Sequence, residues 1–312
     1  MFRVISLFVA AVVLSGCATY GSGINKSLEL TKNGDFIGAQ AIIKKELSPV
    51  GNDRILYYME LGVLEHLAGN YKASIALFEK AERIGEDLYT KRAGELLTVA
   101  MTSPRQGPYR GANYERVLIN YYKAMNFLML GQQADKRSAR EDALEGARIE
   151  VRRLEMNLTA IANEKGSYQD QKDEDEALFA KLSKIFNALN GDFLDKGKLV
   201  YRQDAWANYL SGLTYEQNGE YDDARISYQK AAKLYEEGFQ EQYELDKNIT
   251  EQAWFDTIRM MRKAGGWQSE WPRLAKKKLS KKRRSELKSF DQGAQIVVIE
   301  HVGFAPHRKE LN

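Results

Sequence analysis

Residues 55–84 read ILYYMELGVLEHLAGNYKASIALFEKAERI, and residues 205–235 read AWANYLSGLTYEQNGEYDDARISYQKAAKLY. Both stretches place large, small and aromatic residues in one frame, with a glycine at the centre. In the first stretch the frame is occupied by Tyr58, Leu61, Gly62, Gly69, Tyr71, Phe78 and Ala81. In the second it is occupied by Gly212, Tyr215, Gly219, Tyr221, Ala224, Tyr228 and Ala231. This pattern predicts two helices joined by a turn, because a small residue lets the helices approach while aromatic side chains fill the gap between them.

The frame resembles the tetratricopeptide repeat, a helical hairpin of about 34 residues. Ser74 departs from it where alanine is usual, as do Asn208 and Ser211 in the second copy. A weaker third copy covers residues 24–47 and is marked by Gly34, Phe36, Ala39 and Ile43. Because a stack needs about three repeats to bury a continuous core, we expect further irregular helical pairs.

The middle of the chain is expected to supply such a pair. Residues 114–131 are very apolar and predict a buried helix. Beyond them, apolar residues recur at helical spacing in two stripes, Leu144, Ala147, Val151, Leu154, Leu158 and Ile161, then Leu178, Leu182, Ile185 and Leu189. A short polar link makes two such stripes face each other, which predicts an antiparallel helical hairpin over residues 134–190. The alternative is a coiled coil that binds a partner.

The predicted fold class is therefore mostly α: a helical-hairpin solenoid over residues 25–262 with the inserted hairpin. A basic segment follows at residues 263–290, and a strand-like tail at residues 291–312. Within the tail, the β-branched run from Gln295 to Glu300 predicts a short C-terminal strand.

The amino terminus has the pattern of an export signal. Residues 1–16 combine Arg3, an apolar run from Val4 to Leu14 and small residues before Cys17. The run is shorter than the about 20 residues that a spanning helix needs. Leu14-Ser15-Gly16-Cys17 resembles the lipobox of bacterial lipoproteins, which implies cleavage before Cys17, diacylglycerol on its sulfur and an acyl chain on its amino group. The alternative is an ordinary signal peptide with a chance cysteine at its end.

By the same resemblance, Ala18 in place of aspartate favours the outer membrane, with the chain facing the periplasm. Two or more acyl chains anchor a protein stably. Residues 17–24 are expected to form a lipidated, flexible tether.

Catalytic and metal sites are not expected. The single cysteine excludes an intrachain disulfide and a multi-cysteine metal site. His66, His301 and His307 show no metal-ligand spacing, and common catalytic motifs are absent. We expect no enzymatic activity and no cofactor besides the lipid on Cys17. An envelope hydrolase, the alternative, would need closely set carboxylates or a nucleophile with a base once the chain is folded.

A dense basic run is the main charged feature of a chain whose formal net charge is only +3. Besides Arg273 and Lys288 it contains Lys276, Lys277, Lys278, Lys281, Lys282, Arg283 and Arg284. It reads either as a solvated helix or as a surface for anionic cell-wall or lipopolysaccharide groups. Export places it away from nucleic acid, which is not expected as a partner.

Partner binding is expected in the groove lined by the first helix of each hairpin. The candidate residues are Met59, Val63, His66, Trp206, Tyr209, Leu213 and Glu216. Trp and Tyr are frequent at interface hot spots. The alternative is that these side chains pack against the neighbouring helix.

Residues 114–126, YERVLINYYKAMN, and 147–153, ARIEVRR, together with the lipobox, resemble a family of repeat-containing envelope lipoproteins of Gram-negative bacteria. In that family the strand-like segment leads into a further β-rich region, so this chain, ending at Asn312, is expected to be a shortened member. Family members are encoded near lipoproteins that activate peptidoglycan synthases. The resemblance implies a non-enzymatic scaffold or adaptor that binds another envelope protein and has a link to peptidoglycan assembly.

Overall fold

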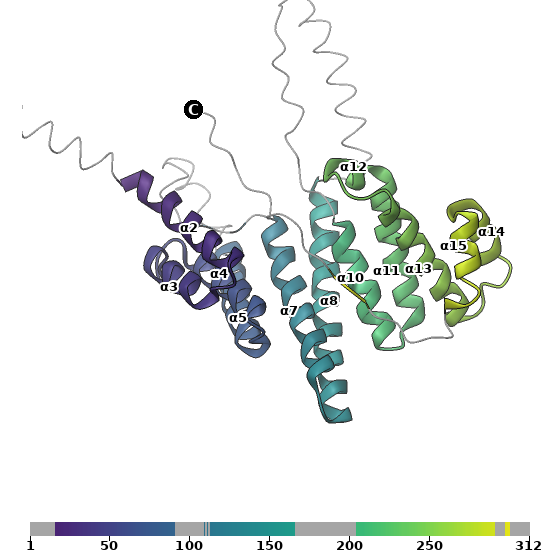
Figure 1. The fold of residues 1–312 in the computed structure, drawn as a ribbon, viewed down its shortest axis with the longest axis horizontal. Coiled ribbons are helices and arrows are strands. Elements are labelled where there is room, and N and C mark those ends of the chain that lie inside the picture. The colour runs from purple at the N-terminus through teal and green to yellow at the C-terminus, as the bar shows by residue number, and fades with distance from the viewer. Residues whose placement is uncertain are drawn as a thin grey trace, which may run out of the picture.

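The computed structural model describes residues 16–90, 109, 111, 113–165, 204–290 and 297–299. Almost all of these residues are helical, which confirms the mostly α prediction (Figure 1). The longer helices are α2 (Gly16–Lys32), α3 (Phe36–Glu46), α4 (Arg54–Leu67), α5 (Tyr71–Thr90), α7 (Asn113–Gln133), α8 (Arg137–Lys165), α10 (Ala205–Gln217), α11 (Tyr221–Leu234) and α13 (Asn248–Ala264). Shorter elements are the π-helical turn η1 (Tyr235–Phe239), α12 (Gln240–Gln242), α14 (Trp271–Lys278) and α15 (Lys281–Glu286).

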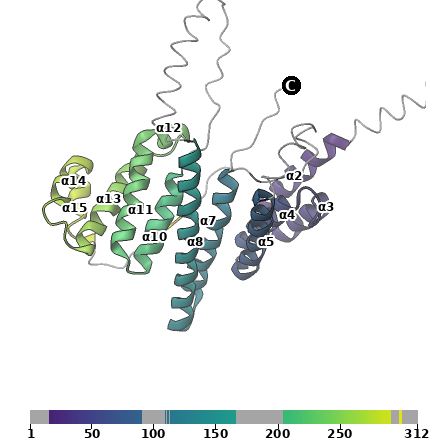
Figure 2. The same ribbon diagram turned by 180° about the vertical axis from the view of Figure 1, so that it is seen from behind.

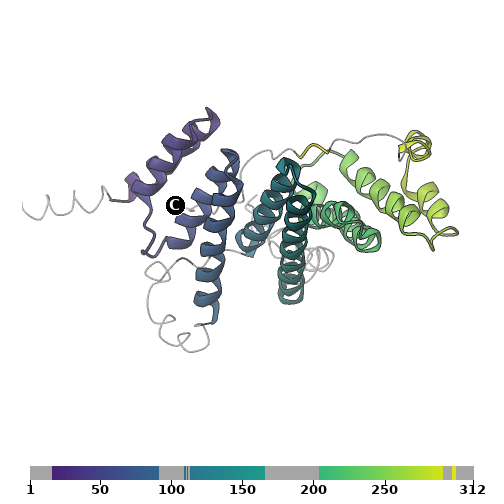
Figure 3. The same ribbon diagram turned by 90° about the horizontal axis from the view of Figure 1, so that it is seen from below.

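The helices pair into hairpins that follow one another in a row. The pairs are α2 with α3, α4 with α5, α7 with α8, and α10 with α11, after which α13 packs on α11 (Figure 1). Seen from below, the row extends from α2 at one end to α14 and α15 at the other (Figure 3). Each hairpin therefore contacts mainly its neighbours.

Three of the hairpins turn at a glycine with a left-handed backbone. Gly34, Gly69 and Gly219 have φ of 76°, 79° and 77°. The residue after each glycine donates its backbone N–H to a carbonyl five positions earlier, which satisfies the last carbonyls of the first helix. The turn is thus the same in the weak copy at residues 24–47 as in the two clear ones.

Inside two hairpins a glycine of the first helix meets an aromatic ring of the second. A Cβ added at Gly62 would lie 2.9 Å from the Phe78 ring, and one added at Gly212 would lie 2.6 Å from the Tyr228 ring. Both rings are fully buried. The small residue is therefore required where the sequence pattern placed it.

The first apolar stripe of the middle region is core. Val151, Leu154, Leu158 and Ile161 of α8 are buried in one cluster with side chains of α7 and α10. Seen from behind, α8 lies between α7 and α10 (Figure 2). The second stripe, Leu178 to Leu189, lies outside the described residues, and the face of α8 expected to meet it is covered by α7 and α10.

The departures from the repeat frame on α10 have a local explanation. Asn208 Nδ2 donates to the Asp204 carbonyl at 2.7 Å, and Ser211 Oγ donates to the Ala207 carbonyl at 3.2 Å. Both residues are buried because helices flank α10 on several sides. Bonding back to its own helix lets a small polar residue occupy a buried position.

The two ends of the chain differ from expectation. Cys17 belongs to α2, so residues 17–24, expected as a flexible tether, are helical. Residues 1–15 lie outside the described part. No helix in the described ranges is long and apolar enough to cross a membrane.

The expected C-terminal strand is not seen. Val297, Val298 and Ile299 have no regular secondary structure, and all three are exposed. A strand needs a partner for its backbone groups, and the described residues contain no other strand. Within the described residues, Val297–Ile299 therefore have no strand to pair with. Gln295, Ile296 and Glu300 lie outside the described residues.

Candidate functional site

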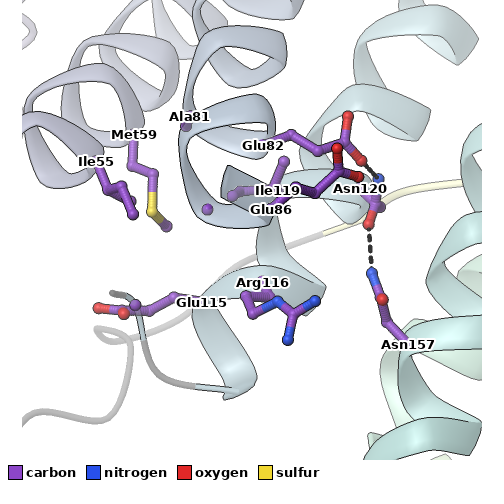
Figure 4. Close-up of a pocket in the computed structure, with 12 residues that line it drawn as sticks. Ile55, Met59, Ala81, Glu82, Glu86, Glu115, Arg116, Ile119, Asn120 and Asn157 are labelled. Atoms are coloured by element: carbon purple, nitrogen blue, oxygen red, sulfur yellow. Dashed lines mark hydrogen bonds between the residues drawn. The ribbon is translucent and has the colours of Figure 1, made fainter. Parts of the chain in front are cut away.

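An open cleft lies between α5 and α8. A smaller cavity adjoins it and is also lined by residues of α4 and α7. The outer cleft, here called the α5–α8 cleft, has a volume of about 580 Å³. Its walls are formed by Glu79, Glu82, Arg83 and Glu86 of α5 and by Arg153, Met156 and Asn157 of α8. The inner cavity of about 40 Å³ shares Glu82, Glu86 and Asn157 with it (Figure 4).

Helical spacing places these side chains in the cleft. Glu79, Glu82 and Glu86 stand three and four positions apart, so they share one face of α5. Arg153, Met156 and Asn157 share one face of α8 for the same reason. The cleft is thus built from two regular helix faces.

A buried lysine is bonded to Glu82, one of the residues in the wall of the cleft. Lys123, on α7, is only 1% exposed, and its Nζ lies 2.8 Å from Glu82 Oε2 and 2.9 Å from Glu150 Oε1. Burying a charge is costly unless it is paired, and here two carboxylates pair with it. Lys123 therefore ties α5, α7 and α8 together.

Two asparagines complete this network. The Asn120 side-chain amide donates to Glu82 at 2.8 Å and to Glu150 at 3.0 Å, while Asn157 Nδ2 donates to Asn120 Oδ1 at 2.9 Å. Figure 4 shows the contacts of Asn120 with Glu82 and Asn157 side by side. This hydrogen-bond network holds the side chains of Glu82 and Asn157 in one arrangement.

Glu82 is committed to this structural role. Burial raises the pKa of its carboxyl group, but hydrogen bonds from Lys123 and Asn120 outweigh burial and hold that pKa below its ordinary value. The group therefore stays ionised near neutral pH. A general acid or base must exchange a proton with a substrate, and these bonds occupy the carboxylate instead.

Another pair of carboxyl groups lies beside the inner cavity. Burial, and then the charge of Glu115, raise the pKa of Glu60. Glu115 itself accepts a hydrogen bond from the Tyr109 hydroxyl at 2.5 Å. The adjoining cavity of about 40 Å³ is small beside the roughly 300–1,000 Å³ of typical ligand pockets. Within the described ranges, no three His, Cys, Asp or Glu side chains are grouped to hold a metal ion.

The groove residues expected on α4 lie at its junction with α7. Met59 is buried with Ile55 and Phe78. His66 Nδ1 lies 2.7 Å from Asn126 Oδ1, and its ring meets that of Tyr122 edge-on at 5.1 Å. Burial lowers the pKa of His66 more than the bond to Asn126 raises it. Val63 is half-buried.

The groove residues expected on α10 lie at its junctions with α7 and α13. The half-buried Trp206 ring is 4.2 Å from that of Tyr121. Tyr209 donates to Asp256 Oδ2 at 2.5 Å, and Glu216 pairs with Arg259. Leu213 is buried.

The seven groove residues therefore divide between two separate junctions. Packing against a neighbouring hairpin accounts for Met59, Leu213, His66 and Glu216. Val63, His66, Trp206, Tyr209 and Glu216 keep part of their surface. Contact of the groove residues with a partner stays a prediction.

The sequence interpretation missed the residues of the α5–α8 cleft. One signal was present: Lys123 and Asn120 are polar residues inside the very apolar stretch 114–131. A lysine in an otherwise buried helix needs charged partners. The partners themselves, Glu82 and Glu150, stand 41 and 27 positions away in the sequence, beyond any local pattern.

Comparisons with known proteins add little. No family model matches the chain, and no curated protein matches it. The crystal structure of BtubC (BKLC) from P. vanneervenii is similar, with 14% sequence identity, a TM-score of 0.46, and coverage of 96% of this chain and 93% of that one. Similarity at this level assigns neither a family nor a function.

Proposed function

We propose that the chain is a non-enzymatic adaptor that binds another envelope protein. Its hairpins are of the tetratricopeptide type, and lipid on Cys17 holds it at the outer membrane, facing the periplasm. The signal-like residues 1–16 and the lipobox support the anchor, since acyl chains on one cysteine suffice for stable attachment. The link to peptidoglycan assembly rests on the resemblance of residues 114–126 and 147–153 to envelope lipoproteins.

The α5–α8 cleft is the observation that carries the proposal. Sites for small molecules are mostly apolar and enclose their ligand, whereas this cleft is open and its walls are charged apart from Met156 and Asn157. The Met156 side chain is 72% exposed. An exposed methionine is adaptable and suits contact with another protein.

The walls also define the chemistry of the partner. Arg83 suits an acidic side chain, whereas Arg153 already pairs with Glu82 at 3.5 Å and with Glu150 at 3.3 Å. Glu79 suits a basic side chain, and Met156 suits an apolar one. A helix or loop with mixed charge and one apolar residue satisfies all three. Because the Lys123 network already orders Glu82 and Asn157 in the free protein, partner binding loses little conformational entropy at these two residues.

The test is site-specific photo-crosslinking in cells. A photoreactive residue at Met156 is compared with one at Ile37, which is also exposed and apolar but lies on α3. We expect a discrete protein adduct from position 156 alone. Arg83→Glu, at an exposed arginine of the cleft wall, should abolish the adduct, whereas Lys45→Glu, on α3, should leave it unchanged.

Two results would decide against this site. Equal adducts from positions 156 and 37 would remove the α5–α8 cleft as the binding surface. Loss of the adduct with Trp206→Ala and Tyr209→Ala, but not with Arg83→Glu, would place the partner on the exposed edges of the α10 junction and keep the adaptor function. Thermal unfolding of each variant shows whether the fold is retained.

A further inference from the structure

The basic residues of the chain are concentrated at one end of the molecule. Residues 271–288 contain nine basic residues and one acidic residue, Glu286. The whole chain has 46 basic and 43 acidic residues, so the other positions hold 37 and 42. A cationic end is thus attached to a body with an acidic excess.

Residues 271–288, here called the cap, fold against α13 at the end of the row. Ala275, Leu279 and Leu287 are buried in one cluster with Trp254 and Phe255. Figure 1 places α14 and α15 at the opposite end of the molecule from α2. The position and orientation of the cap are therefore fixed by its apolar residues.

Two of its basic side chains also hold the cap in place. Lys278 Nζ lies 2.6 Å from Glu236 Oε1 and 4.5 Å from the centre of the Trp254 ring. Arg283 donates to Gln252, pairs with Glu286 at 2.6 Å and lies 3.9 Å from the centre of the Phe255 ring. These contacts explain part of the basic run as structure.

Four lysines of the cap have no such role. Lys276 and Lys277 lie in the last turn of α14, Lys281 and Lys282 begin α15, and all four are exposed. They flank the bend at Leu279 and Ser280, and we call them the lysine corner. No ion pair joins any of the four to the part of the chain that the structure describes. Like charges set this close repel one another, so stability does not account for them.

We propose that the lysine corner binds the headgroups of anionic phospholipids at a membrane surface. Lysines act as point charges without the planar fork with which arginine selects one partner geometry. The four lysines lie on both sides of one bend and are all exposed. Exposed point charges of one sign suit an extended anionic surface rather than a ligand of one fixed shape.

The contact has a consequence for orientation. The corner and α2, which carries Cys17, are at opposite ends of the row (Figure 3). Attachment at both ends would lay the long axis along the membrane. This orientation rests on the lipid anchor proposed above, whereas headgroup binding by the corner does not depend on it.

The test uses the full chain with Cys17→Ser, which prevents acylation. Sedimentation with vesicles of phosphatidylcholine alone is compared with vesicles that also contain phosphatidylglycerol. The difference between the two isolates the electrostatic part from any insertion of residues 1–16. We expect stronger binding to the anionic vesicles, falling steeply as salt is added.

Variants locate the contact. Glutamate at Lys276, Lys277, Lys281 and Lys282 should reduce partition to anionic vesicles by roughly 100-fold or more, since each lysine near such a surface contributes about fivefold. Glutamine at the same four positions is the milder form. The control has the same charge change at four exposed lysines elsewhere, Lys44, Lys45, Lys72 and Lys230, and should keep most of the binding.

Three outcomes would overturn the proposal. Equal binding to neutral and anionic vesicles would show that charge is not involved. Equal loss in the corner and control variants would show that net charge alone matters. Unchanged binding by a corner variant with an intact circular dichroism spectrum would place the contact elsewhere.

Discussion

The hairpins α4/α5 and α10/α11 share one frame but meet their next neighbour through different chemistry. Gly62 and Gly212, 150 positions apart, occupy the same place, as do Phe78 and Tyr228. At that offset His66 corresponds to Glu216. Both residues contact the helix that follows their hairpin. His66 bonds to Asn126 of α7, and Glu216 pairs with Arg259 of α13.

The α4/α5 junction is a chain of hydrogen bonds. His66 Nδ1 donates to Asn126, whose amide donates to Ser74 Oγ at 2.8 Å. Ser74 in turn donates to the Gly62 carbonyl at 2.7 Å. Ser74 replaces the alanine that the repeat frame favours, and Ala224 holds this place in the other hairpin. The departure from the frame therefore builds the junction.

The α10/α11 junction is ionic. Arg259 pairs with Glu216 and, at 3.0 Å, with Asp256. Burial by itself would lower the pKa of Arg259, but the bonds to Glu216 and the charge of Asp256 raise it overall. Burial raises the pKa of Glu216, and the bonds from Arg259 more than reverse this. The frame thus specifies a hairpin, while single polar residues specify how hairpins join.

The largest effect is expected where a buried charge loses its partner. Arg259→Met removes the guanidinium between Glu216 and Asp256, leaves Glu216 with only Lys263 at 3.5 Å as a cation, and should lower the free energy of unfolding by about 3–5 kcal/mol. Urea denaturation measures this change. Arg137→Met removes an arginine of an exposed pair, with Glu141 at 2.7 Å, and should change stability little. Equal effects of the two substitutions would contradict a special role for the α10/α11 junction.

The shared glycine should be the next most sensitive position. Gly212→Ala brings a Cβ against the Tyr228 ring and should destabilise by about 1–3 kcal/mol. Gly62→Ala should cost less, because its nearest ring atom is 2.9 Å away rather than 2.6 Å.

Gly85→Ala is the matched control for both glycine substitutions. Gly85 lies inside α5 with open space around its Cβ position, so alanine should stabilise the helix by up to about 1 kcal/mol. Thermal unfolding of the three variants gives the order. A neutral Gly212→Ala would show that the two helices of the hairpin separate without penalty.

Ser74→Ala gives the α4/α5 hairpin the alanine that the α10/α11 hairpin has at the same place, Ala224. It removes the acceptor of the Asn126 amide and should cost about 1–3 kcal/mol, because a buried donor loses its partner. Ser285→Ala, at an exposed serine of α15, is the control and should have almost no effect. If Ser74→Ala raised the unfolding midpoint, the hydrogen-bond chain would not be stabilising.

The smallest effect is expected in how the free energy of unfolding depends on pH, and it should come from the α4/α5 junction alone. The pKa of His66 is lower in the folded chain than in the unfolded one, so the unfolded chain binds the proton more readily. The contribution of neutral His66 is fully present above its unfolded pKa of about 6.5 and is lost as pH falls from there toward the folded pKa. His66→Gln should flatten this dependence.

The ionic junction provides the contrast for this measurement. The pKa of Glu216 is lowered, so the group stays ionised over the whole window in which His66 titrates. Urea denaturation at several pH values should therefore give parallel curves for Glu216→Gln and the unmodified chain. Parallel curves for His66→Gln and the unmodified chain would instead remove His66 as the source of the pH dependence.

The hairpins were predictable because their decisive contacts are local. Gly62 and Phe78 are 16 positions apart, as are Gly212 and Tyr228, and a repeated frame reveals that spacing. The turn glycines are equally local, since each needs only the backbone of its own helix end. For this reason even the weak copy at residues 24–47 was recognised.

The candidate site was not predictable in the same way. His66 and Asn126 are 60 positions apart, and Lys123 and Glu82 are 41 apart, with no periodicity that links them. The sequence placed the groove residues on the first helices, but packing between hairpins decided how much of each stays exposed. The sequence also showed one uniform basic run. In the tertiary structure Lys278 and Arg283 of that run bond to other parts of the protein, whereas the lysine corner stays exposed.

By itself, then, the sequence determined the mostly α class, the hairpins and their turns, because those depend on residues within a single hairpin. The tertiary structure alone decided which charges are buried, where the α5–α8 cleft opens and that Val297–Ile299 form no strand. These outcomes depend on which surfaces meet after the hairpins have formed. Burial of a polar group is set by partners from distant segments, and only the folded chain brings those segments together.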